Sequence, residues 1–344
     1  VYYSFVKIIF LMNLQDRILL FSALGDQIKR DPNIFFEDSL NNAKISNSWF
    51  TKDNIDVSVS SILKFLEFNN LLEWVSNYSF INKDIKSILI IMAGSIPFVG
   101  LHDLICVLIS GNKAIVKMSS KDNILIETII NNLILLEPKM KDFILITKDV
   151  VKANFDAIIA TGSDNSSKYF DYYFKSTNSI IRKNRRSIAI LDGTESDLEL
   201  NGLADDVFLY FGLGCRSVSK LFLPVNYDLD KLLKALLKYS DVINHQKYSN
   251  NYDYNKTIYL MNKENILDNG FILLKEDVSI QSPISMLFYE FYNSRSELDK
   301  YINDNSNLFQ CIISKNDIDF GQSQFPKLDD YADNIDTLEF LSKL

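Results

Sequence analysis

The fold is decided by residues 87–120, which read SILIIMAGSIPFVGLHDLICVLISGNKAIVKMSS. Residues 88–93 are continuously apolar, which is typical of a short strand buried on both faces of a sheet. Pro97 suits the first turn of a helix running towards residue 110, and residues 114–119 again have the composition of a strand. A strand, a helix and a second strand in this order predict a parallel β-α-β unit.

Residues 87–109 are also long enough to cross a membrane, but their composition argues against it. Gly94, Pro97 and Asp103 lie near the middle of the run. Pro interrupts a helix, and an Asp at the bilayer centre costs about 2.5–3.5 kcal/mol. We therefore expect no transmembrane segment.

The N-terminal run of residues 1–12 is apolar as well, but it spans only about half of the roughly 20 residues that a membrane helix needs. It also lacks the small-residue cleavage site of a signal peptide. We expect residues 1–11 to be a packing segment or sequence upstream of a natural start at Met12.

The alternation of strands and helices continues along the chain and restarts after Ser187. Further strands are expected at residues 143–147, 156–161, 187–191, 219–224, 257–261 and 284–292. Helices are expected at residues 57–78, 122–136, 195–211, 229–239 and directly after Ser163. This order predicts an α/β fold with a parallel sheet covered on both faces, and the restart is the best candidate for a domain boundary.

Composition narrows the class of protein further. The 344 residues are 47% hydrophobic and 23% charged, which excludes a disordered chain and suits two domains. A net charge of -8 repels phosphate backbones, so we expect no nucleic-acid partner. Three cysteines cannot form a disulfide framework and suit a reducing cytoplasm. The chain has two histidines and no zinc motif, so we expect no metal.

Two loops carry candidate functional residues. Gly162 and Ser163 follow a predicted strand and open a helix, where free backbone N–H groups can hold a phosphate, although a Gly at this place is also a common turn. Cys215 lies between Gly214 and Arg216, and the nearby cation is expected to lower the pKa of its thiol towards neutrality. Cys215 is therefore either a nucleophile or a buried cysteine in a glycine turn. Cys106 and Cys311 lie in apolar elements, and we expect both to be core residues.

Five segments together resemble one family, and they occur in the family's order. They are AGSIPFVGLHDLICVLISGNKAIVKMSSKD from residue 93, ATGS from 160, IIRKNRRSIAIL from 180, YFGLGCRSVSKLFLP from 210 and NNYDYNKTIYLMN from 250. The pattern resembles the acyl-CoA reductase family named after LuxC, the fatty acid reductase of bacterial bioluminescence. That family is a branch of the aldehyde dehydrogenase superfamily. The resemblance runs from about Met12 to the C-terminal string FGQSQFPKLDDYADNIDTLEFL.

The resemblance implies an aldehyde-dehydrogenase-like fold with three parts. Residues 1–186 would form the nucleotide cofactor-binding domain on a parallel sheet, and residues 187–318 the α/β catalytic domain that carries the cysteine. Residues 319–344 would return to pack or to oligomerise. A homo-oligomer is implied as well.

The resemblance also implies roles for individual residues. Cys215 matches the nucleophile that takes the acyl group from a thioester. Lys117 matches the lysine that contacts the cofactor's adenosine ribose, and Ser119 lies in the same loop. Gly162 and Ser163 match the turn over which the cofactor's pyrophosphate lies.

Ser120 stands where relatives that prefer NAD often carry a glutamate. A hydroxyl at this position removes a clash with the 2'-phosphate of NADP, so the resemblance implies NADPH as the cofactor.

Two departures from the superfamily pattern affect the expected chemistry. Hydrolytic members carry a Glu where this chain has basic residues, near Arg182 and Lys183, so no base activates water and thioester chemistry is favoured. Relatives usually have Asn where this chain has Ser95, at the oxyanion position, and loss of one such donor typically costs about 100- to 1000-fold in rate.

The expected function is NADPH-dependent reduction of acyl-CoA or an acyl-protein thioester to an aldehyde, with an acyl-protein synthetase as a further partner. The basic run at residues 182–186 is either a site for CoA phosphates or an acidic carrier, or a solvated loop. Two other functions stay open: a CoA-independent aldehyde dehydrogenase, and a catalytically weak or silent acyl-binding scaffold.

Overall fold

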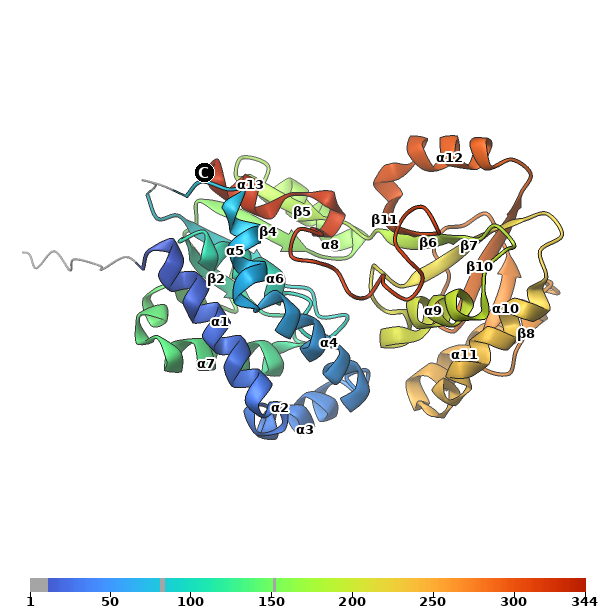
Figure 1. Ribbon diagram of the computed structural model, residues 1–344, viewed down its shortest axis with the longest axis horizontal. Helices are drawn as coiled ribbons and strands as arrows, with labels where there is room; N and C mark the ends of the chain where they lie inside the picture. The colour runs from blue at the N-terminus through green and yellow to red at the C-terminus, as the bar shows by residue number, and fades with distance from the viewer. Residues whose placement is uncertain (1–11, 81–83, 151–152) are drawn as a thin grey trace, which may run out of the picture.

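The computed structural model describes residues 12–80, 84–150 and 153–344, which form two α/β lobes side by side (Figure 1). The expectation for residues 1–11 lies outside the described residues. The first sheet has five strands in the order β3-β2-β1-β4-β5, and the second has six in the order β11-β6-β7-β10-β9-β8. In the described part of the chain, no helix is long and apolar enough to cross a bilayer.

The first sheet is parallel throughout, as the sequence predicts. Its strands are β1 (Ser87–Ile91), β2 (Lys113–Lys117), β3 (Ile144–Ile146), β4 (Ala157–Thr161) and β5 (Asn178–Arg182). Ile88 and Ile90 pack on one face of the sheet, whereas Leu89 and Ile91 pack on the other. Both faces of the central strand are therefore buried, which explains why its sequence is apolar without alternation.

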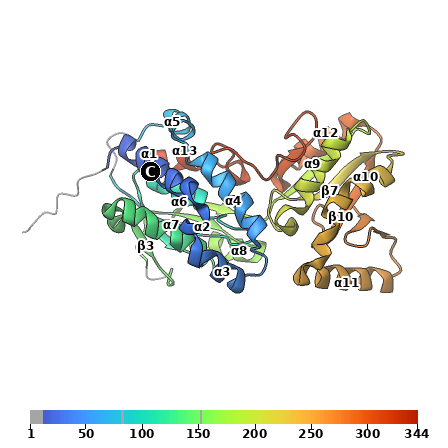
Figure 2. The ribbon, with the colours of Figure 1, turned by 60° about the horizontal axis from the view of Figure 1, so that its bottom comes forward.

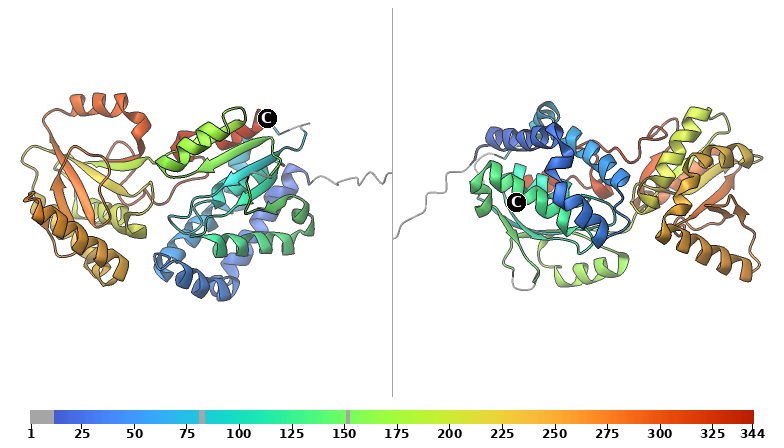
Figure 3. Two further views of the ribbon diagram at one scale, coloured as in Figure 1. Left: turned by 180° about the vertical axis from the view of Figure 1, so that it is seen from behind. Right: turned by 90° about the horizontal axis from the view of Figure 1, so that it is seen from below.

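Helices cover both faces of this sheet (Figure 3). One face carries α1 (Leu14–Arg30), α6 (Leu101–Ile109) and α7 (Asn123–Leu136), whereas α8 (Asp164–Tyr173) covers the other. Four more helices complete this lobe: α2 (Pro32–Phe35), α3 (Glu37–Ser46), α4 (Lys52–Phe65) and α5 (Phe68–Ser76). The single helix expected at residues 57–78 is therefore two helices, α4 and α5, with a break after Leu66.

The helix after β1 begins later than the sequence suggests. Pro97 does not open it, because Phe98 has a φ of 60° and residues 97–100 form a turn. α6 starts at Leu101 with Gly100 at its N-cap position. Ser95 is consequently part of a loop and is not the cap of this helix.

The second sheet is mixed, because β8 pairs with β9 in the antiparallel sense. Its strands are β6 (Arg186–Ile190), β7 (Val218–Pro224), β8 (Leu267–Asp268), β9 (Leu273–Glu276), β10 (Met286–Tyr292) and β11 (Phe309–Ile313). Its helices are α9 (Asp197–Phe208), α10 (Leu229–Leu236), α11 (Gln246–Met261) and α12 (Arg295–Asp304). Short 3₁₀ segments are η1 (Pro138–Asp142), η2 (Leu209–Gly212), η3 (Leu237–Asn244), η4 (Ser306–Leu308) and η5 (Ala332–Asn334).

The strand expected at residues 257–261 is wrong, since these residues form the end of α11. Residues Tyr248, Tyr252 and Asn255 are buried at a helical spacing of four and three along α11. Burial of this face against the second sheet outweighs the β propensity of a short apolar run. The helices expected at residues 195–211 and 229–239 are present but end earlier, where η2 and η3 begin.

The C-terminal segment leaves the second sheet after β11 and returns to the first lobe (Figure 1). It ends in α13 (Thr337–Ser342), whose Leu338 and Leu341 are buried in the same core as Ile88. This part of the C-terminal segment therefore packs on the first lobe.

Candidate active site

Three loops carry six of the residues that the sequence singles out. Ser95 follows β1, the residues Lys117, Ser119 and Ser120 end or follow β2, and Gly162 and Ser163 follow β4. These three strands are neighbours in a parallel sheet. All three loops therefore lie at the carboxyl edge, where open α/β sheets bind their ligands.

The loops after β1 and β2 are in direct contact. A side-chain carbon added to Gly94 would lie 2.4 Å from Oγ of Ser119, so only glycine fits there. The backbone N–H of Met92 donates to the carbonyl of Lys117 at 3.0 Å. The Oγ of Ser119 accepts a hydrogen bond from the N–H of Lys121 at 3.2 Å. The loop with Ser95 and the loop with Ser119 are thus packed as one unit.

The backbone of the turn after β4 is packed closely against side chains of α8. A carbon added to Gly162 would lie 2.8 Å from Cβ of Ser166 and 3.0 Å from the ring of Phe170. Ser163 caps α8, because its side chain accepts a hydrogen bond from the N–H of Ser166 at 3.3 Å. Both residues therefore have a structural role, and the backbone at this turn is what a phosphate could bind.

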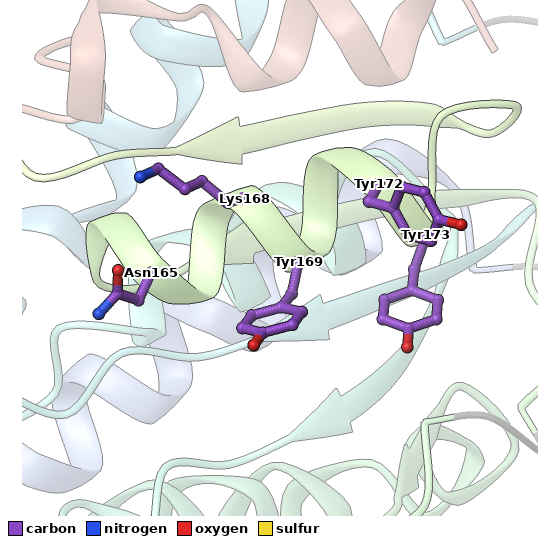
Figure 4. Close-up of a pocket in the computed structure, with 5 residues that line it drawn as sticks. All are labelled: Asn165, Lys168, Tyr169, Tyr172 and Tyr173. Carbon is purple, nitrogen blue, oxygen red and sulfur yellow. The ribbon is translucent and has the colours of Figure 1, made fainter.

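A hollow follows the same turn along α8 (Figure 4). It is lined by Asn165, Lys168, Tyr169, Tyr172 and Tyr173. The rings of Tyr169 and Tyr173 extend from the same side of the helix (Figure 4). Sequence reasoning missed these residues, and the only signal was three tyrosines within one polar helix.

Cys215 lies between η2 and β7, after a turn in an unusual conformation. Tyr210, Phe211 and Gly212 have φ values of 55°, 58° and 73°. A residue other than glycine adopts this region at a cost of about 1–2 kcal/mol. Contacts with α4 hold the turn, since Ser58 Oγ donates to the hydroxyl of Tyr210 at 3.0 Å. Asn54 Oδ1 accepts from the N–H of Tyr210 at 3.3 Å.

The ring of Phe211 provides a second support for this turn. Its centroid lies 5.2 Å from that of Trp49 and 4.4 Å from that of His245. α4 and the segment before it lie on the side of the first lobe that faces the second (Figure 2). Strained backbone held by its surroundings is characteristic of functional sites, and here both lobes supply the support.

The Cys215 loop meets the Ser95 loop. A carbon added to Gly214 would lie 3.8 Å from Cδ1 of Ile96, which follows Ser95 directly. The carbonyl of Cys215 accepts a hydrogen bond from Oγ of Ser187 at 2.9 Å, and the Cys215 side chain is exposed. The neighbours of Cys215 and Ser95 in the sequence, Gly214 and Ile96, therefore lie close together.

Arg216 lowers the pKa of Cys215, as expected from the sequence, but it does not decide the net direction. Although the residue is exposed, the atoms packed around its sulfur desolvate the thiol, and this larger effect raises the pKa of Cys215 above its ordinary value. The guanidinium of Arg216 is turned to other partners: it donates to Sγ of Cys311 at 3.2 Å and to the carbonyl of Asp330 at 3.0 Å.

Cys106 and Cys311 are 0% and 4% exposed, which confirms that they are core residues.

Both histidines make contacts that stabilise the fold. A ring nitrogen of His102 lies 2.9 Å from the carbonyl of Leu328, and desolvation lowers the pKa of His102. His245 caps α11. Among the described residues, no group of His, Cys, Asp and Glu is arranged to hold a metal ion.

The basic run after β5 is engaged by carboxylates of the same chain. Arg182 is 4% exposed and pairs with the carboxylate of Asp103 at 2.5 Å. Lys183 pairs with Asp171 at 3.2 Å, and Arg185 lies 3.6 Å from the carboxylate of Asp333. Arg182, Lys183 and Arg185 therefore have carboxylate partners within the chain, and Lys183 remains exposed.

The C-terminal segment contributes residues that sequence reasoning missed. Gln324 is 4% exposed and its amide donates to Oγ of Ser217 at 3.2 Å, beside the Cys215 loop. The carboxylate of Asp333 raises the pKa of Cys215, after the larger effect of desolvation. These residues are more than 100 positions from Cys215 in the sequence, and the only signal for them was the conspicuous C-terminal string.

Asp206 of α9 forms hydrogen bonds with the backbone of the C-terminal segment. It is 0% exposed and accepts hydrogen bonds from the N–H groups of Gly321 at 2.6 Å and Ser323 at 3.0 Å. Burial raises the pKa of Asp206 to about 6, although both N–H groups lower it. Between pH 4 and pH 6, therefore, the folded protein keeps a proton that the unfolded chain has lost.

We expect this proton to make stability depend on pH. The free energy of unfolding of the wild type, relative to Asp206→Asn, should fall by about 2 kcal/mol from pH 4 to pH 6, because a full pH unit contributes at most about 1.4 kcal/mol and the titrations begin and end within this range. Urea titrations across this range measure it. Asp253→Asn, on the exposed side of α11, controls for the loss of one negative charge. A difference that stays constant or rises with pH would contradict the prediction.

Solved structures with the same architecture are aldehyde dehydrogenases. Betaine aldehyde dehydrogenase from Staphylococcus aureus, determined in complex with NAD+, matches 85% of this chain and 69% of its own, with a TM-score of 0.63 and 14% identity. Gamma-glutamyl-gamma-aminobutyraldehyde dehydrogenase from Burkholderia cenocepacia matches 88% of this chain and 71% of its own, with a TM-score of 0.62 and 12% identity. The fold is thus that of the aldehyde dehydrogenases.

Within that fold, the chain belongs to the acyl-CoA reductase (LuxC) family, whose sequence model matches residues 30–306. The resemblance seen in the sequence is therefore confirmed. A curated relative is long-chain acyl-protein thioester reductase 2 of Photobacterium leiognathi, with 24% identity over 192 residues. The match covers 51% of this chain and 40% of that protein, so it spans less than half of the relative's length.

Proposed function

We propose that this protein reduces an acyl thioester to an aldehyde through an acyl group held on Cys215, with NADPH as the reductant. The observation that supports this most is the contact of the Cys215 loop with the Ser95 loop at the carboxyl edge of the first sheet. Residues 1–186 then serve as the cofactor domain and residues 187–318 as the catalytic domain. The experiment that tests it is incubation with acetyl-, octanoyl- and palmitoyl-CoA plus NADPH, following cofactor absorbance and aldehyde.

The residues at this edge fit a nicotinamide dinucleotide. Gly162 and Ser163 directly precede the first turn of α8, where backbone N–H groups can bind a pyrophosphate. Lys117 ends β2 at the same edge, and Ser120 is exposed beside it. Ser119 and Ser163 complete the set that would hold the cofactor. When bound, reduced nicotinamide supplies hydride to the acyl carbon.

The chain's own residues perform the remaining steps. The Cys215 thiol loses its proton, and the thiolate attacks the thioester carbonyl. The N–H of Cys215 and the hydroxyl of Ser95 donate hydrogen bonds to the oxyanion that develops. The oxyanion then collapses, the carbon–sulfur bond of the donor breaks, and its thiolate leaves and takes up a proton. After reduction, the hemithioacetal on Cys215 breaks down to aldehyde and regenerates the thiolate.

Thioester chemistry is favoured over formation of a free acid. The position where hydrolytic relatives carry a Glu lies near Arg182. The guanidinium of Arg182 forms a buried ion pair with the carboxylate of Asp103. No step above requires a base at that position, because each leaving group is a thiolate.

A catalytically weak or silent acyl-binding scaffold is the second candidate. Two observations favour it: the short side chain of Ser95 at the proposed oxyanion position, and the raised pKa of the Cys215 thiol. Labelling separates the two candidates. An enzyme accumulates an acyl group on Cys215 without NADPH and releases aldehyde with it, whereas a scaffold retains unmodified acyl-CoA.

The cofactor preference gives a prediction of its own. We expect kcat/KM to be higher with NADPH than with NADH, because Ser120 carries no charge that would repel the 2'-phosphate. Ser120→Glu should reverse the preference, since a carboxylate repels that phosphate and accepts hydrogen bonds from ribose hydroxyls. Ser120→Ala is the matched control and should keep the preference for NADPH. Equal kcat/KM values for the two cofactors in the wild type would contradict this role of the loop.

A further inference from the structure

A buried carboxyl group joins the loop of Ser95 to the loop of Ser119. Asp122 follows the β2 loop, directly before α7, and is 3% exposed. Its Oδ2 accepts a hydrogen bond of 2.6 Å from the backbone N–H of Phe98. Its own N–H donates to the carbonyl of Ser119 at 3.2 Å. One residue is therefore bonded to the loop of Ser95 and to the loop of Ser119.

The side chain of Asp122 does not cap α7, although Asp122 occupies the N-cap position. At this position an Asp side chain normally accepts a hydrogen bond from the first turn of the helix. The side chain of Asp122 makes no such bond and is turned towards Phe98 instead. Capping of α7 thus does not account for this residue.

The partner, Phe98, has a backbone conformation that must be held from outside. Its φ of 60° is uncommon for a residue other than glycine. Its ring is 4% exposed and lies 5.5 Å from the ring of Phe36. The ring is thus fixed by the core and the N–H by Asp122. Ser95 lies three residues earlier in the same loop, so the backbone at Phe98 helps to set where Ser95 lies.

The raised pKa of Asp122 is consistent with an uncharged carboxyl group that accepts a hydrogen bond. Burial raises the pKa of Asp122 to about 8, although the N–H of Phe98 lowers it. The other oxygen, Oδ1, is buried and has no hydrogen-bond partner within the described residues. Buried polar atoms of this kind are rare in folded proteins and require an explanation.

We infer that Asp122 is a positioning residue, which holds the Ser95 loop against the Ser119 loop through the backbone of Phe98 and thereby fixes where Ser95 lies. Its catalytic meaning rests on the proposed function. Its effect on the loop does not, because the hydrogen bond to Phe98 is present whatever reaction the site performs.

Hydrogen exchange tests the effect on the loop. In Asp122→Ser the shorter hydroxyl can cap α7 but cannot reach Phe98, so the helix is kept and the bond is lost. Amides of residues 94–100 should exchange at least about 10-fold faster than in the wild type. Asp122→Asn retains an acceptor and should exchange like the wild type. Asp228→Ser removes a carboxylate that accepts from two N–H groups at the start of α10 and should leave residues 94–100 unchanged.

Acylation of Cys215 by palmitoyl-CoA in a single turnover tests the catalytic consequence. Asp122→Ser should slow it about 10-fold or more without weakening palmitoyl-CoA binding, and Asp122→Asn should restore the rate. In a Ser95→Ala background, Asp122→Ser should have no further effect, because both changes remove the same contribution.

The outcomes separate this inference from the proposed function. Unchanged exchange in Asp122→Ser, or additive rate effects in the double variant, would overturn the inference even if Cys215 is acylated. Faster exchange in a protein whose wild type is never acylated would support the positioning of the loop and refute the proposed function.

Discussion

Replacing Cys215 by Ala should abolish the acyl adduct and lower aldehyde formation more than about 1000-fold. The reason is that the acyl group has no other acceptor in the proposed reaction, and removal of a covalent nucleophile typically has effects of this size or larger. Incubation with palmitoyl-CoA without NADPH, followed by mass spectrometry of the intact protein and of its peptides, measures the adduct. Aldehyde formation is measured separately with NADPH present.

The chain supplies its own controls for this experiment. Cys106 and Cys311 are buried, and Cys106→Ala and Cys311→Ala should each keep the adduct on Cys215. The pH dependence adds a second check: desolvation raises the pKa of the Cys215 thiol, so acylation of the wild type should accelerate as pH rises above neutrality. An adduct on Cys106 or Cys311, or full activity of Cys215→Ala, would refute the assignment.

Local patterns were sufficient to predict the central elements of the first lobe, but α1, α2, α3 and β5 were not predicted. β1, β2 and α7 are formed by segments whose apolar residues have the spacing of a buried strand or of an amphipathic helix. The end of α11 was predicted as a strand because residues 257–261 are too few to distinguish the two periods. What decides there is burial of residues one and two turns earlier, at Tyr248 and Tyr252.

For the candidate site, some features could be predicted from the sequence and others could not. The loops after β1, β2 and β4 could be placed together, because adjacent parallel strands end at one edge. The left-handed turn at Tyr210 and Phe211 could not, since tertiary contacts impose it on residues that disfavour it. The same holds for Gln324 and Asp333, which reach the Cys215 loop only because the C-terminal segment crosses back to the first lobe. The net direction of the Cys215 pKa could not be predicted either, because it depends on how strongly the folded protein desolvates the thiol, and the proximity of Arg216 in the sequence does not determine that.

Ser95→Asn should accelerate acylation of Cys215, by up to about 100- to 1000-fold if the amide reaches the oxyanion. The side chain of Ser95 is shorter than that of Asn, so in the wild type the oxygen that develops negative charge is less well stabilised by a hydrogen bond. The gain should appear in kcat and kcat/KM, because the hydrogen bond is stronger in the transition state than with bound thioester. Single-turnover acylation of the wild type and Ser95→Asn measures it, with Ser95→Ala as the matched variant that should be slower than both.

The structure removes one competing explanation for Ser95. α6 begins at Leu101 and has Gly100 at its N-cap position, so Ser95→Asn cannot act by capping that helix. A second competitor is Gln324, whose buried amide lies beside Gly214 and already donates to Ser217. If Gln324 is the donor, Ser95→Asn and Ser95→Ala should both acylate at the wild-type rate, whereas Gln324→Ala should be slow. That pattern would remove Ser95 from the site and assign the oxyanion to the C-terminal segment.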